Sequence, residues 1–436
     1  MSQTRSRRPR FAAFQHRDYR LLWLGQLVSQ TGTQMQLTTV NWHIFTLLRG
    51  QTFVVDVFGS PATFDAPAFA LGALGLVRIV PIIVFALLGG IVADTRDRRK
   101  VMMITQTVAG LAAALLAIAT LAGFEALWVI YILTAVNASA MAFDSPSRQA
   151  LVPRLVPRED LTNALSLNTT LMQVTSIIGP SLAGVLIASV DPGLIYAFNA
   201  LSFGAVVLAL LLMEHRTPPA ASVSTITLSA MLDGARFVFR ERIILSSMLL
   251  DFFATFFASA RTMLPVIAAD ILHTDAHGYG LLSAAQSVGS VIAGLVASLR
   301  HDIPRQGRVL LISVIVYGLA TALFGLSTNF ALSYFLFAIT GAADTVSTVI
   351  RGTMRQLLTP DHLRGRMVGI NMMFFMGGPQ LGEAEAGLVA SRWGIVASVV
   401  SGGLLCLACS TLVAWRYPTL RQYDGPHSVP APAASH

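Results

Sequence analysis

The sequence has little charge: only 12% of its 436 residues are Asp, Glu, Lys or Arg, whereas soluble domains carry about 25%. So few charged side chains leave too little polar surface to cover a water-soluble globule. Hydrophobic residues make up 54% of the chain, and its mean hydropathy is +0.66. The composition therefore excludes an ordinary soluble protein and indicates an integral membrane protein.

Cysteine and lysine are almost absent. Cys406 and Cys409 have a C-x-x-C spacing, but they lie in an apolar run without a second ligand pair, so we expect small core residues and no zinc, redox or disulfide site. The single lysine, Lys100, follows Arg99 and cannot belong to the nucleotide-binding motif G-x-x-x-x-G-K-[ST]. The chain also lacks H-E-x-x-H and a convincing serine nucleophile. We expect no metal, no cofactor, no nucleotide site and no enzyme.

Long apolar runs dominate what is present. A membrane-spanning helix needs about 20 mostly apolar residues, and runs of this length in lipid are helices. The sequence therefore predicts an all-α membrane protein with twelve spans, at 21–48, 67–93, 101–123, 127–147, 163–189, 193–213, 243–270, 278–299, 308–326, 329–350, 367–390 and 394–415.

The positions of the cations predict the topology. With the amino terminus in the cytoplasm, 26 of the 30 Lys and Arg residues fall in inner segments, and only Arg49 and Arg392 fall in outer loops. The remaining two, Arg78 and Arg261, fall inside helices. This asymmetry follows the positive-inside rule, so the pI near 10.1 does not indicate nucleic-acid binding. We expect both termini in the cytoplasm and the protein in a bacterial inner membrane.

The chain divides into two similar halves. The motif R-Q-x-L-x-P begins at Arg148 and again at Arg355, after corresponding helices, which favours an internal duplication. The longest inner loop falls between the halves and contains a linker and an expected interfacial helix. The predicted organisation is a cytoplasmic segment 1–20, a six-helix bundle 21–213, a linker 214–242, a six-helix bundle 243–415 and a cytoplasmic tail 416–436.

A short charged hairpin, GGIVADTRDRRK (89–100), joins the second and third spans. It resembles the loop 2–3 signature of the major facilitator superfamily, G-x-L-A-D-x-x-G-R-[RK], with Gly90, Asp94, Arg98 and Arg99 on the pattern and Asp97 where glycine is usual. The resemblance implies two pseudo-symmetric six-helix bundles and transport by alternating access. It also implies a cytoplasmic latch, in which Asp94 meets the end of helix 11 and Arg98 reaches Asp144 at the end of helix 4.

Further stretches are similar to the bacterial exporter group that contains the enterobactin exporter. They are FDSPSRQALVPRLVPREDLTNALSLN (143–168), Arg261-x-x-x-Pro265 in helix 7, and RGRMVGI from Arg364 to Ile370. This resemblance implies export of a siderophore or an amphipathic, drug-like small molecule. The similar stretch GPSLAG in helix 5 resembles the antiporter motif G-P-x-x-x-G and assigns gating to Gly179, Pro180 and Gly184, although close helix packing explains the same residues.

Charged side chains inside the spans are candidates for coupling, because each costs at least about 2.5–3.5 kcal/mol at the bilayer centre. An interhelical ion pair would explain them without a transport role. Since no nucleotide site is expected, transport would use an ion gradient, and a buried carboxylate can carry a proton. Our candidates, in order, are Asp344, Glu383 and Asp251, with Glu385 beside Glu383.

Polar residues in the spans are candidates for the substrate cavity. Helix 1 carries a polar stripe, and helix 11 contains Gly378 and Pro379, which should break or kink it near mid-membrane. The cavity candidates are Gln30, Gln34, Thr38, Asn41, Arg78, Asn137, Arg261, Gln286 and Gln380.

The sequence thus predicts a monomeric, proton-coupled secondary transporter that exports a small molecule. A nutrient or metabolite importer on the same fold is the first alternative. A non-transporting membrane receptor or a membrane enzyme is the second. The functions of neighbouring genes and a transport assay in inverted vesicles would distinguish these three alternatives.

Overall fold

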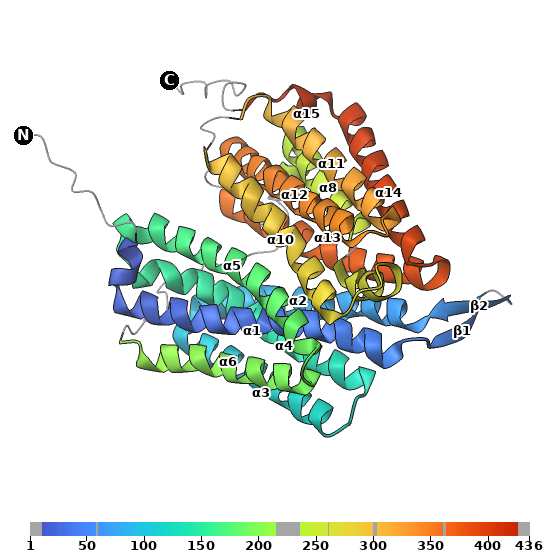
Figure 1. The fold of residues 1–436 in the computed structure, drawn as a ribbon. Coiled ribbons are helices and arrows are strands. Elements are labelled where there is room, and N and C mark those ends of the chain that lie inside the picture. Colours follow the sequence, from blue (N-terminus) through green and yellow to red (C-terminus); the bar gives the residue numbers. More distant parts are fainter. Residues whose placement is uncertain are drawn as a thin grey trace, which may run out of the picture. The chain divides into compact units, whose positions relative to one another are not determined.

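The computed structural model describes residues 11–57, 60–214, 236–259, 261–299, 303–360 and 363–425. These described residues are mostly helical (Figure 1). It forms two compact units: one contains Met1–His43 and Val80–Ser224, and the other contains Ile44–Ile79 and Thr225–His436. Two helices therefore pass from one unit to the other. Most of the expected linker 214–242 and the outer half of each expected terminal segment lie outside the described residues, and the six-plus-six division of the sequence stays a proposal.

The described residues of the first unit form helices and the connections between them. Small residues at the contact of α3 with α4 and α6 let these helices pack closely, with Ala109, Ala113, Ala140 and Phe203 in the core. The elements are η1 (Ala12–Gln15), α1 (Arg17–Leu48) through His43, α2 (Ala66–Thr95) from Val80, α3 (Arg98–Leu121), α4 (Leu127–Leu155), η2 (Arg158–Asp160), α5 (Leu161–Ile187) and α6 (Pro192–Leu212).

The second unit contains the ends of α1 and α2 nearest to the hairpin described below, followed by the second half of the sequence. Here α12 packs against α10 and α11, α14 packs against α11, and α13 packs against α8. The elements are α8 (Arg242–Phe257), η3 (Arg261–Met263), α9 (Leu264–Val266), η4 (Ile267–Ile271), α10 (Ala276–Leu299), α11 (Gln306–Leu326), α12 (Phe330–Leu358), α13 (Arg364–Trp393), α14 (Ile395–Arg416) and α15 (Pro418–Gln422).

Ten helical segments of the described chain are long and apolar enough to cross a membrane, by length and composition. Two further helices, α1 and α13, have 32 and 30 residues, but polar side chains lower their mean hydropathy. With these two the arrangement is consistent with the twelve predicted spans. The polar residues of α1 and α13 are those that the sequence assigned to a cavity and to coupling.

A β-hairpin between α1 and α2 was not predicted. Strands β1 (Thr52–Val57) and β2 (Ser60–Asp65) pair antiparallel, with Phe53 opposite Phe64. The two rings stack at 5.6 Å, and Phe53 also meets Phe69 of α2 edge-on at 5.2 Å. The run TFVVDV is rich in β-branched residues, which suit a strand, and this signal could have revealed the hairpin.

The predicted break lies in a different helix. Helix 7 was expected as one span over 243–270, but α8 ends at Phe257 and the chain resumes in a 3₁₀ turn at Arg261. Pro265 explains this, because its ring would clash with the carbonyl of Arg261 in a continuous helix. In contrast, α13 runs as one helix from Arg364 to Trp393 with Pro379 inside it, so the helix does not break there, and the alternative that Pro379 kinks it stays a prediction. Packed helical bundles tolerate such a proline.

Candidate functional site

A buried arginine joins two acids in the second unit. Arg351 of α12 is 2% exposed, and its Nη2 lies 2.9 Å from Oδ1 of Asp251 on α8 and 3.6 Å from Oδ1 of Asp344 on α12. The Asp251 side chain is 6% exposed, whereas that of Asp344 is 44% exposed. One cation thus faces two acids, and the more exposed acid is the more distant one. Asp344 can gain a proton without leaving Arg351 or Asp251 uncompensated.

The sequence identified both acids but not their partner. Arg351, which the topology prediction placed with the cations of the inner segments, lies inside α12 with a buried side chain. Asp344 and Arg351 are seven residues apart, and this spacing puts both side chains on one face of a helix. The spacing was the signal that could have revealed the pair. One turn beyond, Arg355 donates a hydrogen bond to Asn371 of α13.

A second ion pair links α2 to α13. Nη1 of Arg78 lies 3.6 Å from Oε2 of Glu383, and their side chains are 13% and 8% exposed. Glycines allow the helices to approach so closely: a Cβ on Gly72 would lie 2.6 Å from Cα of Gly387, and one on Gly75 would lie 2.9 Å from Cβ of Glu383. Two of the predicted intramembrane charges are therefore partners of each other.

Other candidates surround this pair. Arg261, at the break after α8, is exposed and interacts electrostatically with both Arg78 and Glu383. Gln380 lies one turn before Glu383 and is half-buried, and Glu385, also half-buried, lies two positions beyond it on a different face. The structure thus brings Arg78, Arg261 and Glu383 together in the second unit.

Aromatic side chains, which the sequence did not point to, lie on α8, the helix that packs against α13. Phe252 stacks on Phe256 at 5.5 Å and meets Phe374 of α13 edge-on at 6.0 Å. A Cβ on Gly378 would lie 2.5 Å from Oγ1 of Thr255, so a larger residue would force the Thr255 side chain to move where α13 crosses α8. Because α8 packs against α13, which carries Glu383, these rings and the arginines near Glu383 suit an amphipathic, anionic molecule.

The polar stripe of α1 lies in the first unit. Thr38 and Asn41 are buried, and Gln30 and Gln34 are half-buried. Thr38 donates to the carbonyl of Gln34 at 3.0 Å, within its own helix. Asn137 of α4 is half-buried in the same unit, whereas Gln286 of α10 is half-buried in the second unit.

Glycine also sets the packing of α5. A Cβ on Gly179 would collide with the side chain of Gln34, so this glycine allows close approach of α5 to α1. Pro180 lies inside the helix, and both Pro180 and Gly184 are buried. These contacts favour the packing explanation for the motif, while a gating role stays a prediction.

The expected latch residues surround the start of α3. Asp144 of α4 is fully buried; its Oδ1 accepts hydrogen bonds from Thr105 (3.1 Å) and Gln106 (2.9 Å), and Arg148 lies 3.8 Å from its Oδ2. The Arg98 side chain is buried too, and its expected pairing with Asp144 stays a prediction. The side chain of Asp94 lies outside the described residues, so its expected contact with helix 11 also stays a prediction.

Two details of this hairpin differ from the expectation. Asp97, which replaces the usual glycine, caps α3, because its Oδ1 accepts a hydrogen bond from the backbone N–H of Arg99 at 3.0 Å. Gly90 has open space where a Cβ would lie, whereas a Cβ on Gly89 would collide with the carbonyl of Ala142. Arg99 donates to the carbonyl of Leu211 at 3.2 Å. The close-packed glycine is thus Gly89.

Known proteins resemble this chain over most of its length. The enterobactin exporter EntS of Citrobacter koseri is 27% identical over 346 residues, which cover 79% of this chain and 82% of that protein. The enterobactin exporter EntS of Shigella boydii is also 27% identical, over 338 residues that cover 77% and 80% of the two chains.

Solved structures share the fold. A D-xylose–proton symporter superposes with a TM-score of 0.69 at 12% identity, covering 93% of this chain and 98% of that one. The nucleoside transporter NupG gives 0.65 at 16% identity, covering 93% and 99%. A bacterial homologue of the iron transporter ferroportin, in an inward-facing state, gives 0.64 at 18% identity, covering 93% and 99%. A profile of the family described as transmembrane secretion effector matches residues 8–433. The chain therefore belongs to this family of major facilitator membrane transporters.

Proposed function

We propose that this transporter is a proton-coupled exporter of a siderophore or of a similar amphipathic, drug-like small molecule. The two EntS relatives support the substrate class and the direction. The arginines near Glu383, together with the phenylalanines of α8, provide cations and apolar rings for such a molecule. The protein would lie in a bacterial inner membrane as a monomer with both termini in the cytoplasm.

The Asp251–Arg351–Asp344 cluster is the observation that carries the coupling proposal. When Asp344 is deprotonated, Arg351 is shared between an acid of its own helix and an acid of α8. Protonation of Asp344 leaves Arg351 to Asp251 alone, which strengthens the link between α12 and α8. The protonation state of one carboxylate would thereby bias the packing of two helices, as a coupled transporter requires.

The Arg78–Glu383 pair would close the transport pathway at its outer end, on the side away from the cytoplasm. An anionic substrate that binds Arg78 or Arg261 competes with Glu383 for these cations. Substrate arrival would then weaken the contact between α2 and α13 and open the exit. On the cytoplasmic side, Asp94, Arg98, Arg99 and Asp144 would form the latch that closes when the exit opens.

Uptake into inverted membrane vesicles tests direction and substrate class. With an acidic lumen, we expect the wild type to accumulate an anionic, amphipathic siderophore, and dissipation of the pH gradient to abolish accumulation. Asp344→Asn should reduce gradient-driven accumulation at least tenfold, while Asp275→Asn, which alters an exposed loop acid, should leave it unchanged. Accumulation only in right-side-out vesicles would instead identify an importer.

A further inference from the structure

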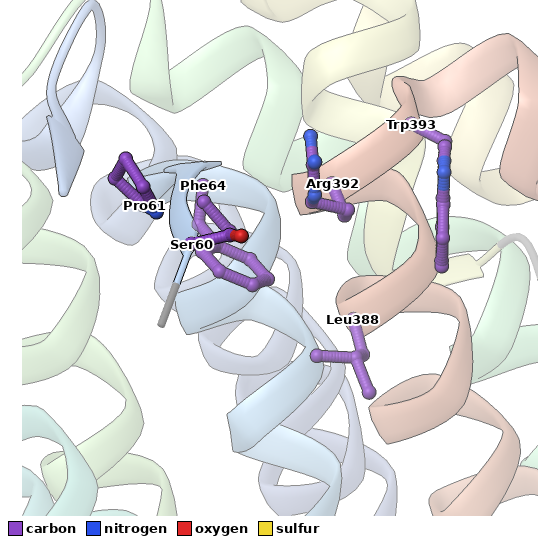
Figure 2. Close-up of a pocket in the computed structure, with 7 residues that line it drawn as sticks. Ser60, Pro61, Phe64, Leu388, Arg392 and Trp393 are labelled. Carbon is purple, nitrogen blue, oxygen red and sulfur yellow. The ribbon is translucent and has the colours of Figure 1, made fainter. Parts of the chain in front are cut away.

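A pocket of about 410 Å³ lies between the β-hairpin and the end of α13, within the second unit. Figure 2 shows Ser60, Pro61 and Phe64 of β2 on one side and Leu388, Arg392 and Trp393 of α13 on the other. This volume is in the range of small-molecule and cofactor sites. The walls are mostly apolar, with one guanidinium group at the rim.

The hairpin wall is held in place by aromatic contacts. Phe64 stacks on Phe53 across the strands at 5.6 Å, and Phe53 in turn packs against Phe69 near the start of α2 at 5.2 Å. The strand side of the pocket is therefore anchored to a membrane helix. An occupant of the pocket would touch β2, which leads directly into α2, and the end of α13.

On the α13 side of the pocket, an apolar side chain is followed by a cation one helical turn later. Leu388 and Arg392 are four residues apart and share a helix face. Leu388 is 51% exposed, and Trp393 is 69% exposed. In the described part of the chain, no acid lies within ion-pair distance of Arg392, whereas Arg49, the other cation expected outside, lies 2.9 Å from Asp270.

The pocket lies where membrane helices end. Trp393 is the last residue of α13, and β2 ends one residue before α2 begins at Ala66. Tryptophan and arginine are favoured at the level of the lipid headgroups, where a ring meets apolar chains and a cation meets phosphate. A soluble anion would use Arg392 but leave Leu388 and the Trp393 ring uncovered.

We propose that this pocket binds an anionic phospholipid, with the phosphate on Arg392 and an acyl chain along Leu388, Trp393 and Phe64. The lipid bridges the hairpin and α13 and thereby stabilises their contact. This site does not depend on the transported substrate or on coupling. The topology proposed above places the lipid in the outer leaflet.

Quenching of tryptophan fluorescence by brominated lipid tests the proposal on the full-length detergent-purified protein. We expect brominated phosphatidylglycerol to bind about tenfold more tightly than brominated phosphatidylcholine, and Arg392→Gln to remove that difference, because a charge-assisted contact is lost. Trp393→Phe should remove the saturable part of the quenching. Arg49→Gln is the matched control and should retain the preference.

Two results would overturn the proposal. One is an unchanged phosphatidylglycerol preference in Arg392→Gln, or the same loss in Arg49→Gln. The other is displacement of the brominated lipid by glycerol phosphate at concentrations equal to those of phosphatidylglycerol, which would identify a site for soluble anions. A failed export assay would leave this result unaffected.

Discussion

Replacement of Arg351 by Gln should destabilise the protein far more than replacement of Asp344, the more exposed of its two acidic partners, by Asn. Arg351 is 2% exposed and its nearer partner, Asp251, is 6% exposed. Arg351→Gln leaves Asp251 as a buried, uncompensated charge. Asp344→Asn leaves the Arg351–Asp251 pair intact and changes a side chain that is 44% exposed.

The distance between Arg351 and Asp251 determines the expected loss of stability in Arg351→Gln. At the observed separation of 2.9 Å, two unit charges attract by about 6 kcal/mol at an effective dielectric constant of about 20. Desolvation offsets part of this attraction, and breaking a buried pair on one side typically costs about 3–5 kcal/mol. For a domain of about 150–250 residues this corresponds to a fall in Tm of roughly 6–20 °C. Asp344→Asn should cost about 1 kcal/mol or less.

Thermal unfolding of the purified protein in detergent measures these differences. The double variant Asp251→Asn/Arg351→Gln removes both charges and should recover at least half of the stability that Arg351→Gln loses, because no uncompensated charge remains. This double-mutant cycle isolates the pair from other effects of each substitution. Strictly additive losses, or an Arg351→Gln variant as stable as the wild type, would refute the ion-pair assignment.

Two other contacts can be tested in the same way. Glu383→Arg alone should abolish transport, and the double variant Arg78→Glu/Glu383→Arg should restore it, since the exchanged pair can still close α2 against α13. Transport rates in vesicles measure this rescue. No rescue would mean that the two side chains do not interact. Gly89→Ala should destabilise the protein by about 1–3 kcal/mol because its Cβ meets the Ala142 carbonyl, whereas Gly90→Ala, with open space around its Cβ, should be tolerated. Equal Tm losses for the two alanine variants would contradict this difference.

The helices could be predicted from the sequence because spanning a bilayer demands long apolar runs. The hairpin could not be predicted in this way, since Thr52–Asp65 is short and lies outside any span. The interruption of helix 7 after Phe257 was not predicted, and α13 was expected to break or kink at a proline where the structure keeps it helical. Both helices contain proline, and the difference depends on how each helix packs, which local sequence does not determine.

The charged residues were identified more readily than their partners. An intramembrane charge is conspicuous in an apolar run, so Arg78, Asp251, Asp344 and Glu383 were all evident. Their pairing depends on tertiary contacts between α2 and α13 and between α8 and α12. Arg351 was missed because its position near the end of a span resembled that of an ordinary positive-inside residue.

Proton movement in reconstituted proteoliposomes tests the central claim, that Asp344 couples transport to protons, most directly. With a pH indicator trapped inside, adding substrate to the wild type should drive a proton flux in the direction opposite to the substrate flux. Asp344→Asn should still bind substrate but move no protons, and Asp275→Asn should behave as the wild type does. A substrate-driven proton flux of wild-type size in Asp344→Asn would contradict the account.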